Sequence, residues 1–395
     1  MLKYWLWLAT RKGLGARGAY LVARYFPTPE VAYFADPKEY KNIGGLRNPA
    51  PLLDKDLSRP EEILRTCYDK GIYIITLQDA AYPNRLRATE DAPVVLYCRG
   101  VVPDLNGPAI GVVGTRRASL YGLNQARRMG YGLSHCGCIL VSGGAKGIDA
   151  EAMRGALLGG SPVVAVMGCG VDVPYPRENK SLLQDVAEHG CILSEYPPGT
   201  PPLSEHFPVR NRIISGLSLG VLVVECPERS GAQITARRAL DQGRDVFALP
   251  ANVGQATGEG NLHLLRDGAI LVRDAWDILQ EYVGLYPDTL KLRQQKDFDE
   301  ETACAQAPQE EPAPAKKLID KAEDRSYIDA KNNWDALDPE QRQLMELLSG
   351  GAVPVDTLAE AMQRPPGIVL AQLTLLEVKG LIRRAPGGKF TVAEN

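Results

Sequence analysis

Short apolar runs alternate with amphipathic helical patterns through the middle of the chain, between about residues 108 and 282. The runs are continuous and rich in β-branched residues, which is typical of strands buried on both faces of a parallel sheet. They are Ala109–Val113, Ile139–Val141, Val163–Met167, Ile192–Leu193, Leu219–Val224 and Val246–Leu249. The helical patterns between them are Tyr121–His135, Asp149–Leu158, Glu178–His189, Gln233–Gln242 and Asn261–Arg266. This alternation predicts an α/β domain with a doubly wound parallel sheet.

The first 75 residues show a different pattern, in which short apolar helices are separated by glycine and proline. Gly13 to Gly18 form a glycine-rich turn between the apolar segments Trp5–Ala9 and Tyr20–Phe26. A turn of this kind can present backbone N–H groups to a nucleic-acid phosphate, as in helix-hairpin-helix domains. An ordinary helical hairpin explains the same residues at least as well, so contact of this domain with DNA stays open. We count the extended segment that follows with the core, as residues 76–283.

The helix and strand patterns disappear between residues 284 and 333, where Lys, Asp, Glu, Gln, Ala and Pro dominate. This composition predicts a disordered linker whose charges face solvent. Residues 334–395 then show three helical patterns and a hairpin around Pro386–Gly388, which indicates a winged helix. The third helical pattern carries little positive charge, whereas the hairpin has Arg383, Arg384 and Lys389. DNA and a protein partner are therefore equally consistent with this domain.

Charge and cysteine content narrow the function classes further. The net charge of −3 gives no sign of a nucleic-acid partner, yet cations exceed acids locally between Gly114 and Arg154. The eight cysteines contain no C-x-x-C pair, so we expect reduced thiols, no metal site and no cofactor. The N-terminal apolar run is too short to cross a bilayer. We therefore expect a cytoplasmic protein without a membrane partner.

Two glycine-rich turns follow predicted strands and precede predicted helices. Carboxyl ends of parallel strands meet at one sheet edge, where helix N-termini, backbone N–H groups and nearby cations favour a bound phosphate. The candidate phosphate-binding residues are Gly114, Thr115 and Arg116 in the first turn, and Ser142, Gly143, Gly144, Lys146 and Gly147 in the second. Neither turn reads G-x-G-x-x-G or ends in G-K-[ST], so the sequence gives little support for dinucleotide binding or ATP hydrolysis.

A third segment, Phe207–Gly216, places Phe207, Arg210, Asn211 and Arg212 close together in the sequence. Cations beside an aromatic ring suit a single strand, because phosphates bind the cations and an unpaired base stacks on the ring. Structural alternatives stay open. The two arginines could pair with Glu205 and Glu225, and Phe207 could be a core residue. We expect Asp149 to brace the start of its helix rather than to act in catalysis.

At these residues the chain resembles the DNA-processing protein A family, called DprA or Smf. The resemblance is dense from about Gly107 to Leu279 and rests on many spaced motifs. They include Gly114-Thr-Arg116, Ser142–Asp149, Gly168–Asp172, Tyr175-Pro176-x-x-Asn179, Leu193–Pro198, Phe207–Ser218, Ser230–Ala236 and Gly260-Asn261. Upstream, Tyr82-Pro83-x-x-Leu86 and Asp91–Tyr97 fit the family's entry to this domain.

The resemblance implies a Rossmann-like core that binds single-stranded DNA without sequence preference and has no catalytic residues. It also implies an N-terminal sterile-alpha-motif-like domain and a C-terminal winged helix. The implied partners are the recombinase RecA, loaded onto incoming DNA during natural transformation, and a second copy of the chain; single-strand-binding protein is a further candidate. The family's dimer and RecA surface falls on Leu264, Leu265, Arg266, Ile270 and Leu271. Thr115, where the family often has serine, keeps the hydroxyl.

The competing hypothesis is a nucleotide-riboside hydrolase. Related Rossmann-like enzymes use a P-G-G-x-G-T-x-x-E segment, and the nearest match here is Ser230–Arg238. In that register Arg238 takes the place of the catalytic glutamate. A guanidinium cannot serve as a general base, so the enzyme is the weaker hypothesis.

Overall fold

A nine-stranded sheet with the order β1-β2-β6-β5-β4-β3-β7-β8-β9 forms the centre of the first of two compact units. The computed structural model describes residues 1–290, 339–364, 369–370, 372–373, 376–377, 381–385 and 389–392. The strands are β1 (Tyr73–Thr76), β2 (Val95–Gly100), β3 (Ala109–Val113), β4 (Ile139–Ser142), β5 (Val163–Met167), β6 (Gly190–Ser194), β7 (Gly220–Val223), β8 (Asp245–Ala248) and β9 (Ile270–Leu271). The seven neighbouring strands β6-β5-β4-β3-β7-β8-β9 are parallel. Strand β2 pairs antiparallel with both β1 and β6. The predicted α/β class is confirmed.

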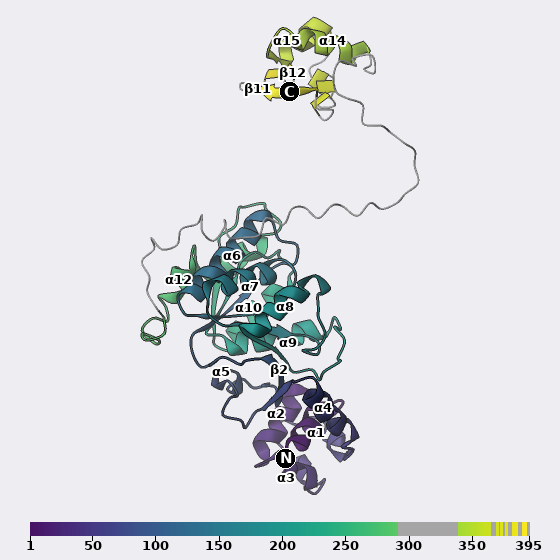
Figure 1. Ribbon diagram of the computed structural model, residues 1–395, viewed down its shortest axis with the longest axis vertical. Helices are drawn as coiled ribbons and strands as arrows, with labels where there is room; N and C mark the ends of the chain where they lie inside the picture. Colours follow the sequence, from purple (N-terminus) through teal and green to yellow (C-terminus); the bar gives the residue numbers. More distant parts are fainter. Residues whose placement is uncertain are drawn as a thin grey trace. The chain divides into compact units, whose positions relative to one another are not determined.

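The helices of this unit pack beside one another in two groups. Helices α6 (Leu120–His135), α7 (Ile148–Gly159) and α8 (Lys180–Glu188) form one, while α9 (His206–Leu217) packs beside α10 (Gly231–Asp241) (Figure 1). The chain moves outward from β3 through β4, β5 and β6, then returns to the other side of β3 at β7. The sheet is therefore doubly wound. Its topological switch point lies between β3 and β7, where such sheets bind ligands.

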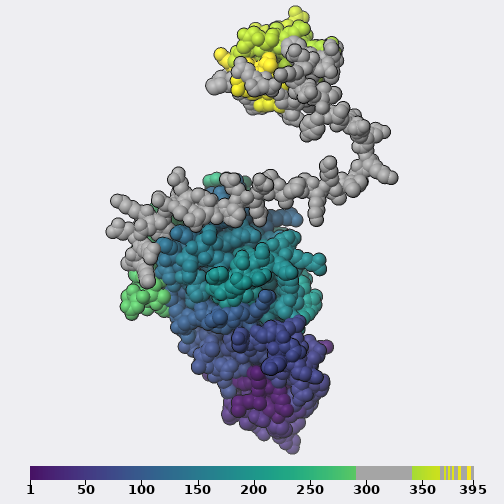
Figure 2. Space-filling model, in the orientation of Figure 1, coloured from purple at the N-terminus to yellow at the C-terminus, as the bar shows by residue number. Residues whose placement is uncertain are grey.

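The N-terminal helices share one continuous hydrophobic core with the sheet. They are α1 (Leu2–Thr10), α2 (Gly15–Tyr25), α3 (Pro29–Phe34) and α4 (Ser58–Asp69), with the short α5 (Asn84–Arg87) further along the chain. Figure 2 shows the N-terminal residues continuing without a break into the surface of the core. The predicted boundary at residue 75 falls inside β1, which belongs to the sheet.

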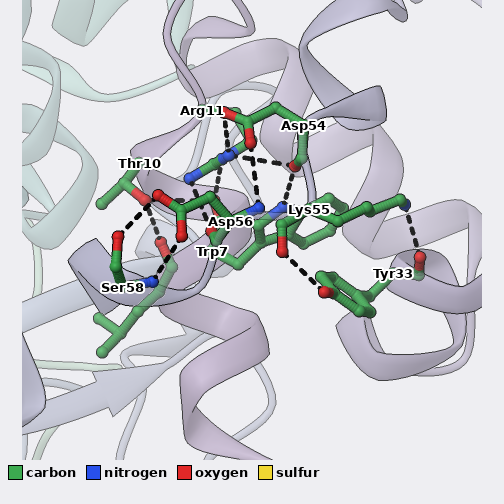
Figure 3. A network of polar contacts seen from close by, with 9 residues as sticks. Trp7, Thr10, Arg11, Tyr33, Asp54, Lys55, Asp56 and Ser58 are labelled. Atoms are coloured by element: carbon green, nitrogen blue, oxygen red, sulfur yellow. Dashed lines mark hydrogen bonds and ion pairs between the residues drawn. The ribbon is translucent and has the colours of Figure 1, made fainter. Parts of the chain in front are cut away.

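Polar contacts fix the segment before α4 onto α1 (Figure 3). Trp7 Nε1 donates to the Asp54 carbonyl at 2.7 Å, and Arg11 forms an ion pair of 2.6 Å with the Asp54 carboxylate. Lys55 Nζ lies 4.9–5.1 Å from the ring centroids of Trp7, Tyr33 and Tyr40, within the range of cation–π attraction. It also donates to the Tyr40 hydroxyl at 2.6 Å.

The core extends slightly beyond its predicted end. After α11 (Glu259–Arg266) and α12 (Ala275–Leu279), the chain continues in contact with the sheet domain as far as Leu290, which is only 2% exposed. The linker start at 284 stays a prediction, although apolar side chains near Leu290 still pack on the core. Most of the predicted 284–333 linker lies outside the described residues.

The second unit has the elements of a winged helix. Its described elements are α14 (Pro339–Leu348), β10 (Val353–Pro354), α15 (Val355–Met362), β11 (Ile382–Ala385) and β12 (Lys389–Val392). The strands form a small sheet with the order β10-β12-β11. Val369, Leu373 and Leu376, spaced as on a helix, are buried in its core. The predicted hairpin is confirmed, while its turn, Pro386–Gly388, lies outside the described residues. No helix in the described ranges is long and apolar enough to span a membrane.

Candidate nucleic-acid interface

A cleft of about 720 Å³ opens at the switch point, beyond the carboxyl ends of β3 and β7. Three segments contribute much of its lining: the turn after β3, the first half of α9 and the loop that leads from β7 into α10. These segments are distant in the sequence, and the topology brings them to one edge of the sheet. A smaller hollow of about 100 Å³, lined by the second glycine turn, shares Arg116, Phe207 and Arg210 with the cleft.

The first glycine turn connects the exits of β3 and β7. Thr115 N donates to the Glu225 carbonyl at 2.8 Å, and the Thr115 carbonyl accepts from Ile148 N. Gly114 is required here, because an added Cβ would lie 2.5 Å from Ile148 Cγ1. Arg116, which follows Thr115, is exposed and lines the cleft, and its role as a phosphate-binding cation stays a prediction.

The second glycine turn is held by hydrogen bonds to the side chain of Asp149. This buried carboxylate accepts from the backbone N–H of Gly143 at 3.1 Å and of Ala145 at 3.4 Å. Burial raises the pKa of Asp149, and the charge of Arg210 opposes that shift. Gly147, the residue before the start of α7, has a φ of +77°, a conformation that favours glycine. Asp149 therefore braces the turn at the start of α7, as expected.

Arg210 lies under the same turn and also lines the cleft. Its Nη1 donates to the Gly143 carbonyl at 2.8 Å and to the Val166 carbonyl, and its side chain is 4% exposed. Burial lowers the pKa of Arg210 to about 10, with Asp149 opposing the shift, so the guanidinium stays charged at neutral pH. Its Nε has no hydrogen-bond partner among the described residues. The alternative that Arg210 pairs with Glu205 or Glu225 is wrong, because its neighbouring carboxylate is Asp149.

The predicted role of Arg212 as a phosphate contact is corrected. Arg212 is 3% exposed, forms an ion pair with Glu195, and lies 3.6 Å from the Asp91 carboxylate. Two residues on a helix lie roughly 200° apart around its axis, so Arg210 and Arg212 cannot both face the cleft.

Glu225, the other proposed partner of these arginines, is held elsewhere. It accepts from Ser119 N at 2.8 Å and from Thr257 Oγ1 at 2.6 Å. The carboxylate therefore secures the N-terminal end of α6.

Phe207 is half-buried and lines both the cleft and the smaller hollow. The Arg116 guanidinium lies 5.3 Å from its ring centroid, and the Tyr175 ring lies 5.4 Å away. The alternative of a plain core residue does not fit this position. Asn211, also half-buried, lines the cleft and donates to the Gly231 carbonyl at 3.3 Å.

In the second glycine turn, Lys146 lines the smaller hollow, whereas the side chain of Ser142 lies in the core. Ser142 is fully buried and its hydroxyl donates to the Val112 carbonyl at 2.8 Å, so its predicted contact with a phosphate is wrong. Gly143 and Gly144 line the hollow with their backbone. Lys146 is exposed and forms an ion pair of 2.5 Å with Glu178.

The predicted excess of cations does not form one basic surface. Arg127 and Arg154 both pair with Glu151, which removes them from the free positive charge near the cleft. The cleft instead has two arginines that the candidate set omitted, Arg117 and Arg229, together with Tyr175. Arg229 follows the end of the fifth predicted strand, Leu219–Val224, so the same reasoning that selected the glycine turns could have found it.

The residues of the implied dimer and RecA surface lie at one edge of the sheet. Leu264 and Leu265 on α11 are half-buried and Arg266 is exposed. Ile270 and Leu271 form the edge strand β9, and are 37% and 52% exposed. Among the described residues, no group of three or more His, Cys, Asp or Glu side chains is arranged to hold a metal ion.

Comparisons with protein families, related sequences and solved structures all point to the same family. Residues 73–283 match the family model of DNA recombination-mediator protein A, and residues 329–388 match the DprA winged helix domain. The chain is 41% identical over 241 residues to DNA processing protein DprA of Streptococcus pneumoniae, covering 61% of this chain and 85% of that protein. It is 36% identical over 318 residues to protein Smf of Escherichia coli, covering 80% and 76%. The X-ray structure of the pneumococcal protein aligns with a TM-score of 0.64 and 35% identity, over 71% of this chain and 98% of that one.

Proposed function

The chain belongs to the DNA recombination-mediator protein A family, and we propose that it binds single-stranded DNA without sequence preference in the cleft at the switch point. One observation carries this proposal: Arg116 lies over Phe207 at the cleft wall, with the charge of Arg210 behind it. Cations bind phosphates and the ring stacks on any base, so this combination suits a single strand.

The proposed cleft positions a strand and does not cut it. Among the described residues that line the cleft, the one carboxylate is that of Asp149, which is buried and bound to the glycine turn. Arg238, at the position of the hydrolase glutamate, is exposed on α10 and lies 4.0 Å from Asp241. A general base needs to accept a proton, which an arginine cannot do. These observations make a nucleotide-riboside hydrolase the weaker, alternative function. Release of ribose or base from nucleotides would support that alternative.

The partners follow from the family. We propose that the protein loads RecA onto the bound strand in natural transformation or recombination in the cytoplasm, and that it acts as a homodimer. The exposed side chains of Ile270 and Leu271 support self-association, because an apolar edge strand is a ready pairing surface. Single-strand-binding protein is a further proposed partner.

Gel-shift titration with single- and double-stranded DNA of the same sequence tests the proposal. We expect the single strand to bind more tightly, and binding to be unaffected by base composition. Addition of RecA in a strand-exchange assay then tests loading. Equal affinity for both forms of DNA, or nucleotide turnover that is lost in an Asp149→Asn variant, contradicts the proposal.

A further inference from the structure

The cleft continues into a second open groove of about 730 Å³ on the outer side of α10. The two hollows share Arg229, Ser230 and Ile234 as lining residues, so a ligand can pass from one into the other over these side chains. We name this second hollow the α10 groove; beyond the shared residues it is lined by Glu228, Gln233, Arg237, Arg238 and Asp241.

The α10 groove offers positive charge that the fold does not use. Arg229 and Arg237 are exposed, and neither forms an ion pair with the described residues. Arg238 is exposed, and its ion pair with Asp241 is long, at 4.0 Å. The other acidic residue of the groove, Glu228, lies 3.9 Å from His263 Nδ1. A polyanion in the groove therefore meets arginines without displacing a close ion pair.

The junction of the two hollows also has features that suit a nucleic-acid chain. Ser230 caps α10 by accepting from Ala232 N at 3.2 Å, so the positive end of this helix opens at the junction. An added Cβ at Gly231 would meet nothing within 4 Å, which leaves the backbone there accessible. Ile234 is 42% exposed at the same place and offers an apolar surface for a base.

From these observations we infer that a single strand leaving the cleft continues along the α10 groove, with Arg229, Arg237 and Arg238 as its phosphate contacts. The inference rests on the proposed function and lengthens its binding site. Continuity with the cleft favours a strand over an acidic protein, since one chain of phosphates can occupy both hollows. It also gives a role to Arg238, which replaces the glutamate of the related hydrolases.

The test compares oligo(dT) of about 4 and about 16 nucleotides, the range of site sizes in single-strand binders. We expect full-length Arg237→Ala/Arg238→Ala protein to lose about tenfold in affinity for the long oligonucleotide and less than twofold for the short one. Its salt slope for the long oligonucleotide falls by about 1.4, because each lost phosphate contact removes about 0.7. Arg116→Ala weakens binding of both lengths, and Arg273→Ala, an exposed arginine paired with Asp277, serves as the matched control.

Because Arg237 also lines a hollow beside β9, light scattering of the double variant accompanies the titration. A changed oligomeric state alters affinity without lowering the number of phosphate contacts in each site, so the salt slope separates the two effects. An unchanged affinity and slope for the long oligonucleotide overturn the inference, and would assign the groove to another partner while the cleft proposal stands. Equal losses for both lengths also overturn it. If the wild type binds neither oligonucleotide, the proposed function fails first.

Discussion

At the scale of single residues, the cleft separates side chains that bind a ligand from side chains that hold the binding surface in shape. Arg116 is exposed, whereas Arg210 and Asp149 are buried against the turn of Gly143. The sequence could predict the cations near the glycine turns, because strand ends and helix starts are readable. It could not show that Arg212 points to Glu195, since the phase of α9 relative to the sheet depends on packing between distant segments.

Arg116→Ala is predicted to weaken binding of single strands about tenfold, which corresponds to loss of one charge-assisted contact. The loss should be similar for every sequence, because the contact is to phosphate, and the salt slope should fall by about 0.7. Fluorescence anisotropy with oligonucleotides of different composition measures both. Arg273→Ala is the control, and a sequence-dependent loss would mean that Arg116 contacts bases.

Glu178→Gln is predicted to strengthen binding about twofold at low salt, because it frees Lys146 from its exposed ion pair. The hydrogen bond from Lys146 lowers the pKa of Glu178, so this carboxylate is ionised at neutral pH and competes with a phosphate. The same substitution in a Lys146→Ala background should have no effect. A gain that persists in that background would place the repulsion elsewhere.

At the scale of elements, the continuous apolar runs predicted β3 to β8 well because each is buried on both faces. Strands β1 and β9 lie at the two edges of the sheet, and β2 lies between β1 and β6. The short extended segment expected at residues 72–76 corresponds to β1, whereas β2 and β9 were not predicted as strands. Apolar residues also could not reveal that the N-terminal helices and the sheet share one core, because two separate cores would require the same pattern. The position of Lys55 among three rings is a further consequence of packing between elements.

The lowered pKa of Lys55 makes the free energy of unfolding depend on pH. Burial, with a further contribution from Arg11, lowers the pKa of Lys55 to about 8, whereas the unfolded chain has a value of about 10.4. Between these values the unfolded state binds more protons, so the free energy of unfolding should rise with pH. Because Lys55 is half-exposed, the rise should be only about 1 kcal/mol.

Denaturant titrations of wild type and Lys55→Met from pH 8 to pH 10 measure this difference. Burial raises the pKa of the Cys67 and Cys169 thiols to about 11, which lowers the stability of both proteins over this range. The contribution of Lys55 is therefore the rise of wild type relative to the variant. Tyr40, whose pKa is raised to about 12 by burial, opposes the trend only above pH 10. Parallel curves for the two proteins would show that Lys55 titrates normally.

At the scale of the whole molecule, we expect the β9 edge of the sheet, and not the β1 edge, to form the proposed dimer contact. Leu271→Arg is predicted to convert the proposed dimer into monomers, because it places a charge on the exposed β9 edge. Multi-angle light scattering measures the mass. Tyr73→Arg is the matched control, since Tyr73 is 65% exposed on β1 at the opposite edge. A dimer that survives Leu271→Arg would exclude β9 as the pairing surface.

The buried side chains of Asp149 and Arg210 beneath the second glycine turn have a consequence for the speed of binding. Asp149 and Arg210 fix that turn through bonds to Gly143 that involve no ligand, so this wall of the cleft needs no ordering when a strand arrives. Little conformational entropy is then lost by this part of the protein on association. Encounter should be limited by diffusion and by electrostatic attraction over about 10 Å at moderate salt, and the lifetime of the complex should set its affinity.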